Sequence, residues 1–227
     1  DHLKIEKIKK IELRNVCFDY PEFKNVLRNI SLTIGNNDQI AIVGKNGSGK
    51  STLFKILCGL YYPERGEILI NDKPIEKYSI EEYRERTSVL FQDFLKYEGS
   101  LKENVILGDI RRDSIDDNVN DALNKANVDF LREEKKYFLD RILGNWFDNG
   151  SQLSGGQWQK IALARVYYKE ADIYLLDEPS SALDAMAELK IFNSFFEVSK
   201  EKMAIYITHR VKIAKNATKI VVIDNGE

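Results

Sequence analysis

Cysteine is scarce in this sequence, whose 227 residues include only Cys17 and Cys58. The two lie far apart, in no metal-ligand spacing, within segments patterned for burial, so we expect reduced core thiols and neither a disulfide nor a metal site. The sequence also lacks an apolar run near the roughly 18–20 residues that a membrane-spanning helix needs, and it lacks a signal-peptide pattern.

Neither sign of charge dominates the composition. The formal net charge is −2 and the pI is about 5.9. This balance argues against binding of nucleic acid or anionic lipid through the overall charge of the domain, so that such binding would need a local basic patch. Hydrophobic residues at 43% and charged residues at 31% are typical of a globular protein with a real core. The length predicts one domain, with or without a subdomain.

The two ends of the sequence resemble cut ends. Residues 1–10, "DHLKIEKIKK", look more like a charged linker than a domain start, and "KIVVIDNGE" (219–227) stops just after a strand and its turn. We therefore expect a domain over 11–227 that belongs to a longer protein.

Strands and helices alternate along the chain, as in a mainly parallel sheet with crossover helices. The apolar runs at 39–43, 172–178 and 203–209 predict central strands covered on both faces. Partial period-2 patterning predicts half-buried strands at 11–21 and 29–35. Further strands are predicted at 66–72 and 87–93, and helices at 51–59, 80–86, 101–107, 114–126 and 185–200.

Helix-end signals are clear at several points. Gly59 closes the helix at 51–59, and capping boxes are predicted for Ser79 with Glu82 and for Ser100 with Glu103. Residues from about 94 to 153 show helical patterns and little strand signal, which predicts a helical insert.

The stretch "GKNGSGKS" fits the phosphate-loop pattern G-x-x-x-x-G-K-[ST] between a strand and a helix. It comprises Gly44, Lys45, Asn46, Gly47, Ser48, Gly49, Lys50 and Ser51, and Thr52 follows in the helix. The glycines let backbone N–H groups wrap around phosphate oxygens, and the helix N-terminus adds partial positive charge. Lys50 would reach the β- and γ-phosphates and Ser51 would bind Mg²⁺. The alternative is a glycine-rich turn before a helix.

The run "IYLLDE" ends a second apolar strand in two carboxylates. Asp177 fits a Mg²⁺ anchor, and Glu178 fits a general base that polarises the attacking water. The alternative is a strand end that turns at the following proline.

The stretch "LSGGQ" (153–157) opens a helix with an exposed, glycine-flanked N-terminus, because Ser154 is an N-cap type and Gln157 lies at the third helical position. Such an end is a second anion site, and one phosphate loop per chain then suggests a ligand shared between two chains. The alternative is an ordinary capped helix. The residues concerned are Ser154, Gly155, Gly156 and Gln157.

Together these motifs resemble the nucleotide-binding domain of ATP-binding cassette (ABC) proteins, over essentially the whole chain. The matches are 44–51 to Walker A, Gln92 to the Q-loop, 153–157 to the signature, 173–178 to Walker B, "SALD" with Asp184 to the D-loop, His209 to the switch histidine, and Tyr20 to the aromatic that stacks on adenine. The resemblance implies an α/β fold of the P-loop NTPase (RecA-like) type. It has a mainly parallel core, an N-terminal antiparallel β-subdomain and an inserted α-helical subdomain at about 94–153.

The resemblance also implies roles and partners. Two domains pair head to tail around two Mg-ATP, each signature capping the γ-phosphate held by the other's Walker A. Gln92 would contact Mg²⁺ or water, His209 would hydrogen-bond the γ-phosphate, and Asp184 would support the partner's site. The alternatives are a surface glutamine at Gln92, a structural histidine at His209 and a packing role for Tyr20.

The resemblance favours an exporter at the cytoplasmic face of the cell membrane. Residues 1–10 resemble the tether from an upstream transmembrane domain, whose coupling helices would be partners. Phe147, Asp148-Asn149 and Trp158 depart from the common exporter pattern and, with "FQDFLKY" (91–97), resemble exporters of lantibiotic-type peptides.

Three other functions stay open. An ABC ATPase of DNA or the ribosome is disfavoured by the missing coiled-coil insertion and the acidic balance, so we expect no nucleic-acid partner. A non-catalytic regulator is disfavoured because Glu178, the signature and His209 are all present. An importer subunit is the nearest rival among transporters.

Overall fold

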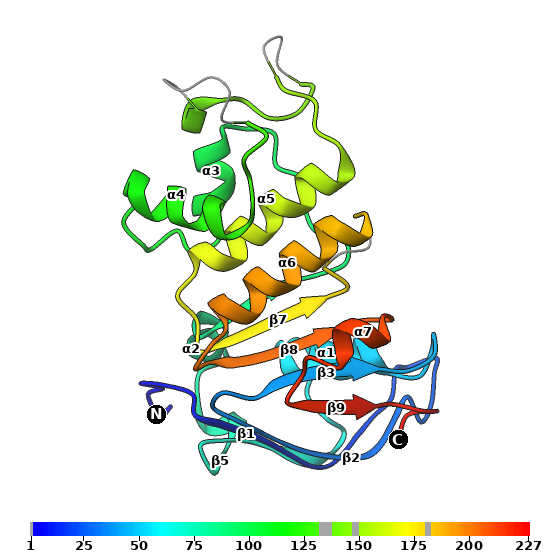
Figure 1. Cartoon of the computed structure of the whole chain (residues 1–227). Coiled ribbons are helices and arrows are strands. Elements are labelled where there is room, and N and C mark those ends of the chain that lie inside the picture. The colour runs from blue at the N-terminus through cyan, green and yellow to red at the C-terminus, as the bar shows by residue number, and fades with distance from the viewer. Residues whose placement is uncertain (1, 132–137, 147–149, 180–182) are drawn as a thin grey trace. The chain divides into compact units, whose positions relative to one another are not determined.

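The computed structural model describes residues 2–131, 138–146, 150–179 and 183–227 (Figure 1). The chain forms two compact units. Unit 1 comprises Asp1–Val89, Ala171–Glu178 and Ser199–Glu227, and unit 2 comprises Leu90–Glu170 and Pro179–Val198.

Unit 1 contains a five-stranded sheet in the order β6-β7-β8-β3-β9. Its strands are β3 (Gln39–Val43), β6 (Thr87–Leu90), β7 (Ile173–Asp177), β8 (Met203–Ile207) and β9 (Lys219–Val222). Strand β3 pairs in parallel with β8 and β9, and β8 pairs in parallel with β7. Every residue of β7 and β8 is buried, which explains their continuous apolar runs. The predicted mainly parallel sheet is confirmed.

A second, antiparallel sheet in unit 1 has the order β2-β1-β4-β5. It consists of β1 (Lys10–Phe18), β2 (Leu27–Gly35), β4 (Arg65–Ile70) and the short β5 (Lys73–Pro74). Alternate residues of β1 face the core, as its period-2 pattern predicted. The antiparallel N-terminal sheet is therefore confirmed, and its buried side chains join those of β3, β7 and β8 in one apolar core.

Three α-helices accompany these sheets in unit 1: α1 (Lys50–Leu57), α2 (Ile80–Glu85) and α7 (Val211–Ala214). A 3₁₀ turn covers Ile75–Lys77. Gly59 follows α1 with φ 68°, a left-handed conformation that suits glycine after a helix end.

The capping box predicted at Ser79 is wrong. The Ser79 hydroxyl donates to Glu81 Oε2 at 2.6 Å and does not cap α2. Glu82, its expected partner, instead accepts a hydrogen bond from the backbone N–H of Ile5 at 3.0 Å. The carboxylate of Glu82, predicted to cap α2, therefore bonds a segment that is distant in the sequence.

The segment before β1 packs onto unit 1. Ile5 and Ile8 lie in the core, and the N–H of Ile8 donates to Asp172 Oδ2 at 2.9 Å. Leu3 donates its N–H to the carbonyl of Lys77 at 2.7 Å. The assignment of residues 1–10 as a linker stays a prediction.

Unit 2 is helical (Figure 1). Its helices are α3 (Leu101–Ile106), α4 (Asp116–Lys125), α5 (Gly155–Tyr168) and α6 (Ala185–Val198), with a 3₁₀ turn at Phe138–Asp140. Helix α5 contacts both α3 and α4, and α4 also contacts α6. The capping box of Ser100 with Glu103 is confirmed. Among the described residues, no helix is long and apolar enough to cross a membrane.

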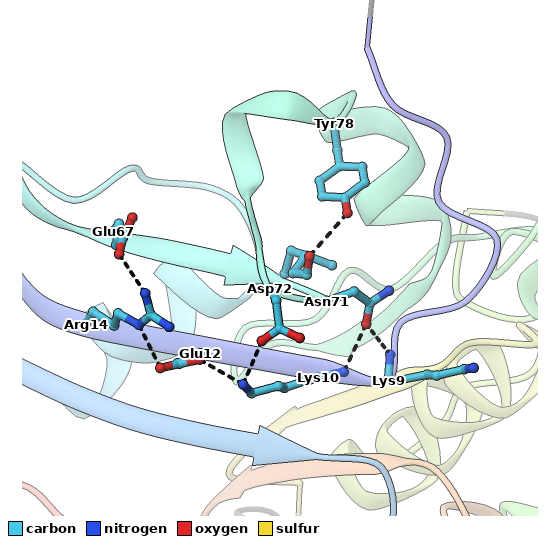
Figure 2. A network of polar contacts seen from close by, with 9 residues as sticks. Lys9, Lys10, Glu12, Arg14, Glu67, Asn71, Asp72 and Tyr78 are labelled. Carbon is cyan, nitrogen blue, oxygen red and sulfur yellow. Dashed lines mark hydrogen bonds and ion pairs between the residues drawn. The ribbon is translucent and has the colours of Figure 1, made fainter.

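A polar network covers one face of the antiparallel sheet in unit 1 (Figure 2). Glu12 lies between two cations, with Arg14 Nε at 2.7 Å and Lys10 Nζ at 2.9 Å. Lys10 also pairs with Asp72 at 2.7 Å, and Arg14 with Glu67 at 3.1 Å. Hydrogen bonds from Arg14 and Lys10 lower the pKa of Glu12 to about 2.

We expect Glu12→Gln to lower the free energy of unfolding by a small amount at neutral pH, since it removes a carboxylate held between two cations. A depressed pKa contributes stability that is present above the ordinary value and lost as the pH falls through the folded value. The difference from the unsubstituted chain should therefore narrow as the pH falls from about 4.5 towards about 2. Thermal unfolding of both chains across that pH range measures this difference. The exposed Glu76→Gln is the control, and a pH-independent difference for Glu12→Gln would contradict the assignment.

Two glycines of the loop after β3 differ in their surroundings. A Cβ on Gly44, at φ 155°, would lie 2.2 Å from the carbonyl oxygen of Ile223, whereas a Cβ on Gly47, at φ 77°, would meet nothing within 4 Å. Gly47→Ala should lower the free energy of unfolding by about 1–2 kcal/mol, the cost of a left-handed conformation in a residue with a Cβ. Gly44→Ala adds a backbone clash and should cost about 2–5 kcal/mol. Urea unfolding of both variants measures the difference, and equal losses would refute the close approach at Gly44.

Candidate functional site

Three loops of unit 1 begin at one edge of the parallel sheet. Ile207 of β8 pairs with Ile42 of β3 on one side and with Asp177 of β7 on the other. The carboxyl ends of these strands are thus level, and the residues that follow them, Gly44, Glu178 and Thr208, start from neighbouring positions. This edge is where open α/β sheets bind their ligands.

Lys50 folds back over the phosphate loop. It is the first residue of α1 and only 6% exposed. Its ammonium donates to the carbonyl oxygens of Gly44 at 2.9 Å and Lys45 at 2.8 Å. Both acceptors are neutral, and a phosphate oxygen is a stronger acceptor for a cation than a carbonyl. The loop therefore holds a buried ammonium whose hydrogen bonds can transfer from these carbonyls to a bound anion.

The rest of the loop also fits a phosphate group. Ser48 Oγ is buried and has no hydrogen-bond partner in the part of the chain that the structure describes. Gly49 precedes α1 with φ 109° and no side-chain cap, so the first N–H groups of the helix keep their capacity to bind an anion. A buried hydroxyl, a helix N-terminus and Lys50 together suit a polyphosphate.

Tyr20 lies beside the first turn of α1. Its hydroxyl is 3.3 Å from Thr52 Oγ1. Its ring packs edge-on against Phe18, at 5.0 Å between centroids, and against Tyr61, at 5.7 Å. This aromatic cluster gives Tyr20 a packing role, and the adenine-stacking role stays a prediction.

Glu178 and His209 are in direct contact, although they follow different strands. His209 Nε2 lies 2.7 Å from Glu178 Oε1, and the two side chains are 46% and 23% exposed. Glu178 has φ 48°, a left-handed conformation that costs about 1–2 kcal/mol in a residue with a Cβ. Strain of this kind is found preferentially at functional sites. No sequence pattern predicts this contact, because it depends on the pairing of β7 with β8.

The candidate Mg²⁺ ligands belong to different parts of the chain. Asp177 ends β7 as a buried carboxylate, and Ser51 is exposed in the first turn of α1. Hydroxyl and carboxylate oxygens suit Mg²⁺, which keeps several waters and needs few protein ligands. Among the described residues, no group of three or more His, Cys, Asp or Glu side chains could hold a metal ion.

Cys58 is a buried core residue. Its burial, with a smaller contribution from the charge of Asp177, raises the pKa of its thiol.

The signature residues cap α5 in unit 2. Ser154 Oγ accepts from the N–H of Gln157 at 3.2 Å, and Gln157 Oε1 accepts from the N–H of Ser154 at 2.8 Å. The predicted N-cap is confirmed, and both Ser154 and Gly155 are exposed. Gly156 follows in the first turn, and Trp158, one of the departures from the exporter pattern, is buried.

Gln92 and Asp184 also belong to unit 2. Gln92 is exposed in the irregular segment after β6. Asp184 Oδ1 accepts from the N–H groups of Ala187 and Met186, both at 2.9 Å, and these bonds hold the pKa of Asp184 below its usual value. Asp184 is thus the N-cap of α6.

The structure therefore gathers the candidates in two sets. Unit 1 contains the phosphate loop, Tyr20, Asp177, Glu178 and His209, and unit 2 contains Gln92, residues 154–157 and Asp184. Phe147, Asp148 and Asn149, and the first two residues of "SALD", lie outside the described residues.

Comparison with known proteins gives consistent relatives. A family model described as "ABC transporter" matches residues 27–181. The subtilin transport ATP-binding protein SpaT of Bacillus subtilis is 46% identical over 224 residues, which cover 98% of this chain and 36% of that protein. The nisin transport ATP-binding protein NisT of Lactococcus lactis subsp. lactis is also 46% identical, over 98% of this chain and 37% of its own length.

A solved structure agrees with these relatives. A bacterial Atm1-family ABC exporter with ATP bound matches with a TM-score of 0.87 and 28% identity, over 99% of this chain and 38% of that one. This chain thus spans little more than a third of the length of each of these three proteins. ATP hydrolysis coupled to transport is the general function of this family, and the resemblance to exporter-type domains that the motifs predicted is confirmed. The chain belongs to the ABC transporter family, as an ATP-binding domain.

Proposed function

We propose that this chain hydrolyses Mg-ATP as the motor domain of an ABC exporter. The observation that carries the proposal is the common edge of β3, β7 and β8, where the buried ammonium of Lys50 and the Glu178–His209 contact occur in one unit. The first feature supplies charge for a polyphosphate and the second supplies a base with an orienting partner.

Lys50, Ser48 and the N–H groups at the start of α1 would bind the phosphates of ATP. Lys50 would exchange its two neutral carbonyl acceptors for β- and γ-phosphate oxygens. Ser51, Asp177 and Gln92 would hold Mg²⁺, directly or through water. When bound, Mg²⁺ neutralises charge that develops on the transferred phosphoryl group. Tyr20 would stack on adenine.

Glu178 would accept the proton of the attacking water, and His209 would orient it and the γ-phosphate. In the structure His209 Nε2 lies 2.7 Å from Glu178 Oε1, so engagement of the γ-phosphate by His209 would release the carboxylate for water. Glu178 directly follows β7 and has a left-handed backbone conformation. Catalysis of this kind depends on positioning and charge.

A second copy of the domain is the partner that we propose for the signature. The exposed N-terminus of α5 at Ser154 and Gly155 suits an anion, as the capped helix leaves further N–H groups for it. Head-to-tail pairing would bring this end to the γ-phosphate on the other copy, with Asp184 beside it. Two Mg-ATP would then be trapped in the dimer.

The whole protein would work at the cytoplasmic face of the membrane. We propose that 11–227 forms the nucleotide-binding domain, that its helical subdomain at about 94–153 contacts transmembrane coupling helices, and that 1–10 links it to an upstream transmembrane domain. Relatives named for subtilin and nisin transport support a lantibiotic-type peptide as cargo, with another small molecule as the alternative.

Glu178→Gln should reduce kcat for ATP hydrolysis by about 10²–10⁴-fold, because loss of a general base has this magnitude. ATP binding should be retained, and the variant should accumulate as an ATP-dependent dimer in size-exclusion chromatography. The exposed Glu64→Gln serves as the matched control. Turnover at the unsubstituted rate would remove Glu178 from the role of base.

Lys50→Ala should weaken ATP binding by about 10–100-fold, since a charge-assisted hydrogen bond contributes about 1.5–3 kcal/mol. Calorimetric titration with ATP and Mg²⁺ measures the change. Lys55→Ala, in the same helix, should bind as the unsubstituted chain does. Unchanged affinity of Lys50→Ala would count against the phosphate-loop assignment.

A further inference from the structure

The chain between β6 and α3 has no regular structure, and two of its carbonyl groups accept hydrogen bonds from side chains. Residues 91–99, which include Gln92, form neither helix nor strand. The carbonyl of Leu95 accepts from Arg165 Nη1 at 2.7 Å, and that of Tyr97 accepts from Asn104 Nδ2 at 2.9 Å. Backbone groups that lack secondary-structure partners need others. Here two side chains supply them.

All three guanidinium nitrogens of Arg165 donate hydrogen bonds to this part of unit 2. It projects from α5, and besides Leu95 it bonds the carbonyl oxygen of Asn104 through Nε and the side-chain Oδ1 of Asn104 through Nη2, both at 2.8 Å. Its guanidinium carbon lies 4.8 Å from the centroid of the Tyr97 ring. Burial lowers the pKa of Arg165 to about 10. All of its hydrogen-bond acceptors are neutral, so the contacts fix geometry and do not neutralise charge.

Asn104 completes the connection from α3. Its side chain is fully buried, and while Oδ1 accepts from Arg165, Nδ2 donates to the carbonyls of Tyr97 and Ser100. Every hydrogen-bonding group of this amide except one lone pair is therefore used. The end of α3 also approaches α5 closely, because a Cβ on Gly108 would lie 2.1 Å from the carbonyl oxygen of Arg165.

We propose that Arg165 is a positioning residue that holds residues 91–99, the Gln92 segment, against α5, so that these two parts of unit 2 move as one body. The inference rests on the proposed function, in which Gln92 contacts Mg²⁺ or water and Ser154 meets the partner's ATP. Nucleotide-dependent displacement of one part would then be imposed on the other. Arg165 itself touches no nucleotide in this scheme.

The geometry requires arginine. Lysine has the charge but no planar fork, so it cannot bond Leu95 and both oxygens of Asn104 while it stacks on Tyr97. Glu98 adds a separate connection, because its Oε2 accepts from the N–H groups of Asn145 and Trp146 at 2.9 and 2.6 Å. Loss of Arg165 should therefore release residues 94–97 first.

Limited trypsin digestion of the 227-residue chain tests the connection without any activity, because Lys96 lies in the irregular segment. Arg165→Lys should accelerate cleavage after Lys96 at least tenfold, whereas cleavage after Lys160 in α5 should stay within about twofold. Tyr97→Leu, which removes only the stacking partner, should give a smaller change at the same site and is the variant to use if Arg165→Lys does not fold. Faster cleavage throughout α3 and α5, or an unchanged rate after Lys96, would overturn the proposal.

Arg112→Lys is a matched control. Arg112 also lies in unit 2, bonds a backbone carbonyl of α5, that of Tyr168, and stacks on that residue's ring at 5.1 Å. It has no contact of this kind with residues 91–99, so the rate of cleavage after Lys96 should not change.

Steady-state kinetics provide the second readout. Arg165→Lys should lower kcat at least tenfold and leave KM for ATP within about threefold, and Arg112→Lys should change neither. An unchanged kcat per folded molecule of Arg165→Lys would refute the positioning role. If the unsubstituted chain hydrolyses no ATP, the proposed function fails, whereas the digestion experiment still decides whether Arg165 holds the Gln92 segment.

Discussion

The register of three parallel strands is the constraint on which the candidate site depends. Ile207 pairs with Ile42 and Asp177, so β3, β7 and β8 end level with one another. The phosphate loop, Glu178 and His209 lie at the same edge for this reason. A shift of one residue in this pairing would turn each strand's side chains to the opposite face of the sheet. Close packing of the buried side chains of β7 and β8 resists such a shift.

Lys50 and Arg165 use the same kind of acceptor. Lys50 bonds the carbonyls of Gly44 and Lys45, and Arg165 bonds those of Leu95 and Asn104. A neutral acceptor leaves the positive charge uncompensated. At Lys50 that charge faces a loop suited to phosphate and can serve binding. At Arg165 the fork fixes an irregular segment instead, and the stacked ring of Tyr97 completes its surroundings.

Local features of the sequence predicted most of the fold, because they depend on neighbours along the chain. The apolar run of β3, the glycine spacing of its loop and the capping box at Ser154 are of this kind. Distant contacts could not be predicted. Glu82 leaves its helix end for Ile5, Glu178 meets His209, and Arg165 reaches Leu95, 70 residues away in the sequence. The only available signal for Arg165 was a cation within an otherwise apolar helix segment, "IALARVYY".

The hydrogen bonds of Lys50 have a consequence for how tightly the loop can bind. Since the ammonium already ties Gly44 and Lys45 together, the loop has its curved shape before a ligand arrives. The conformational entropy of that shape is lost when the chain folds, so this part of the ordering cost is not met again on association. Association should then be fast, with differences among nucleotides expressed mainly in their residence times.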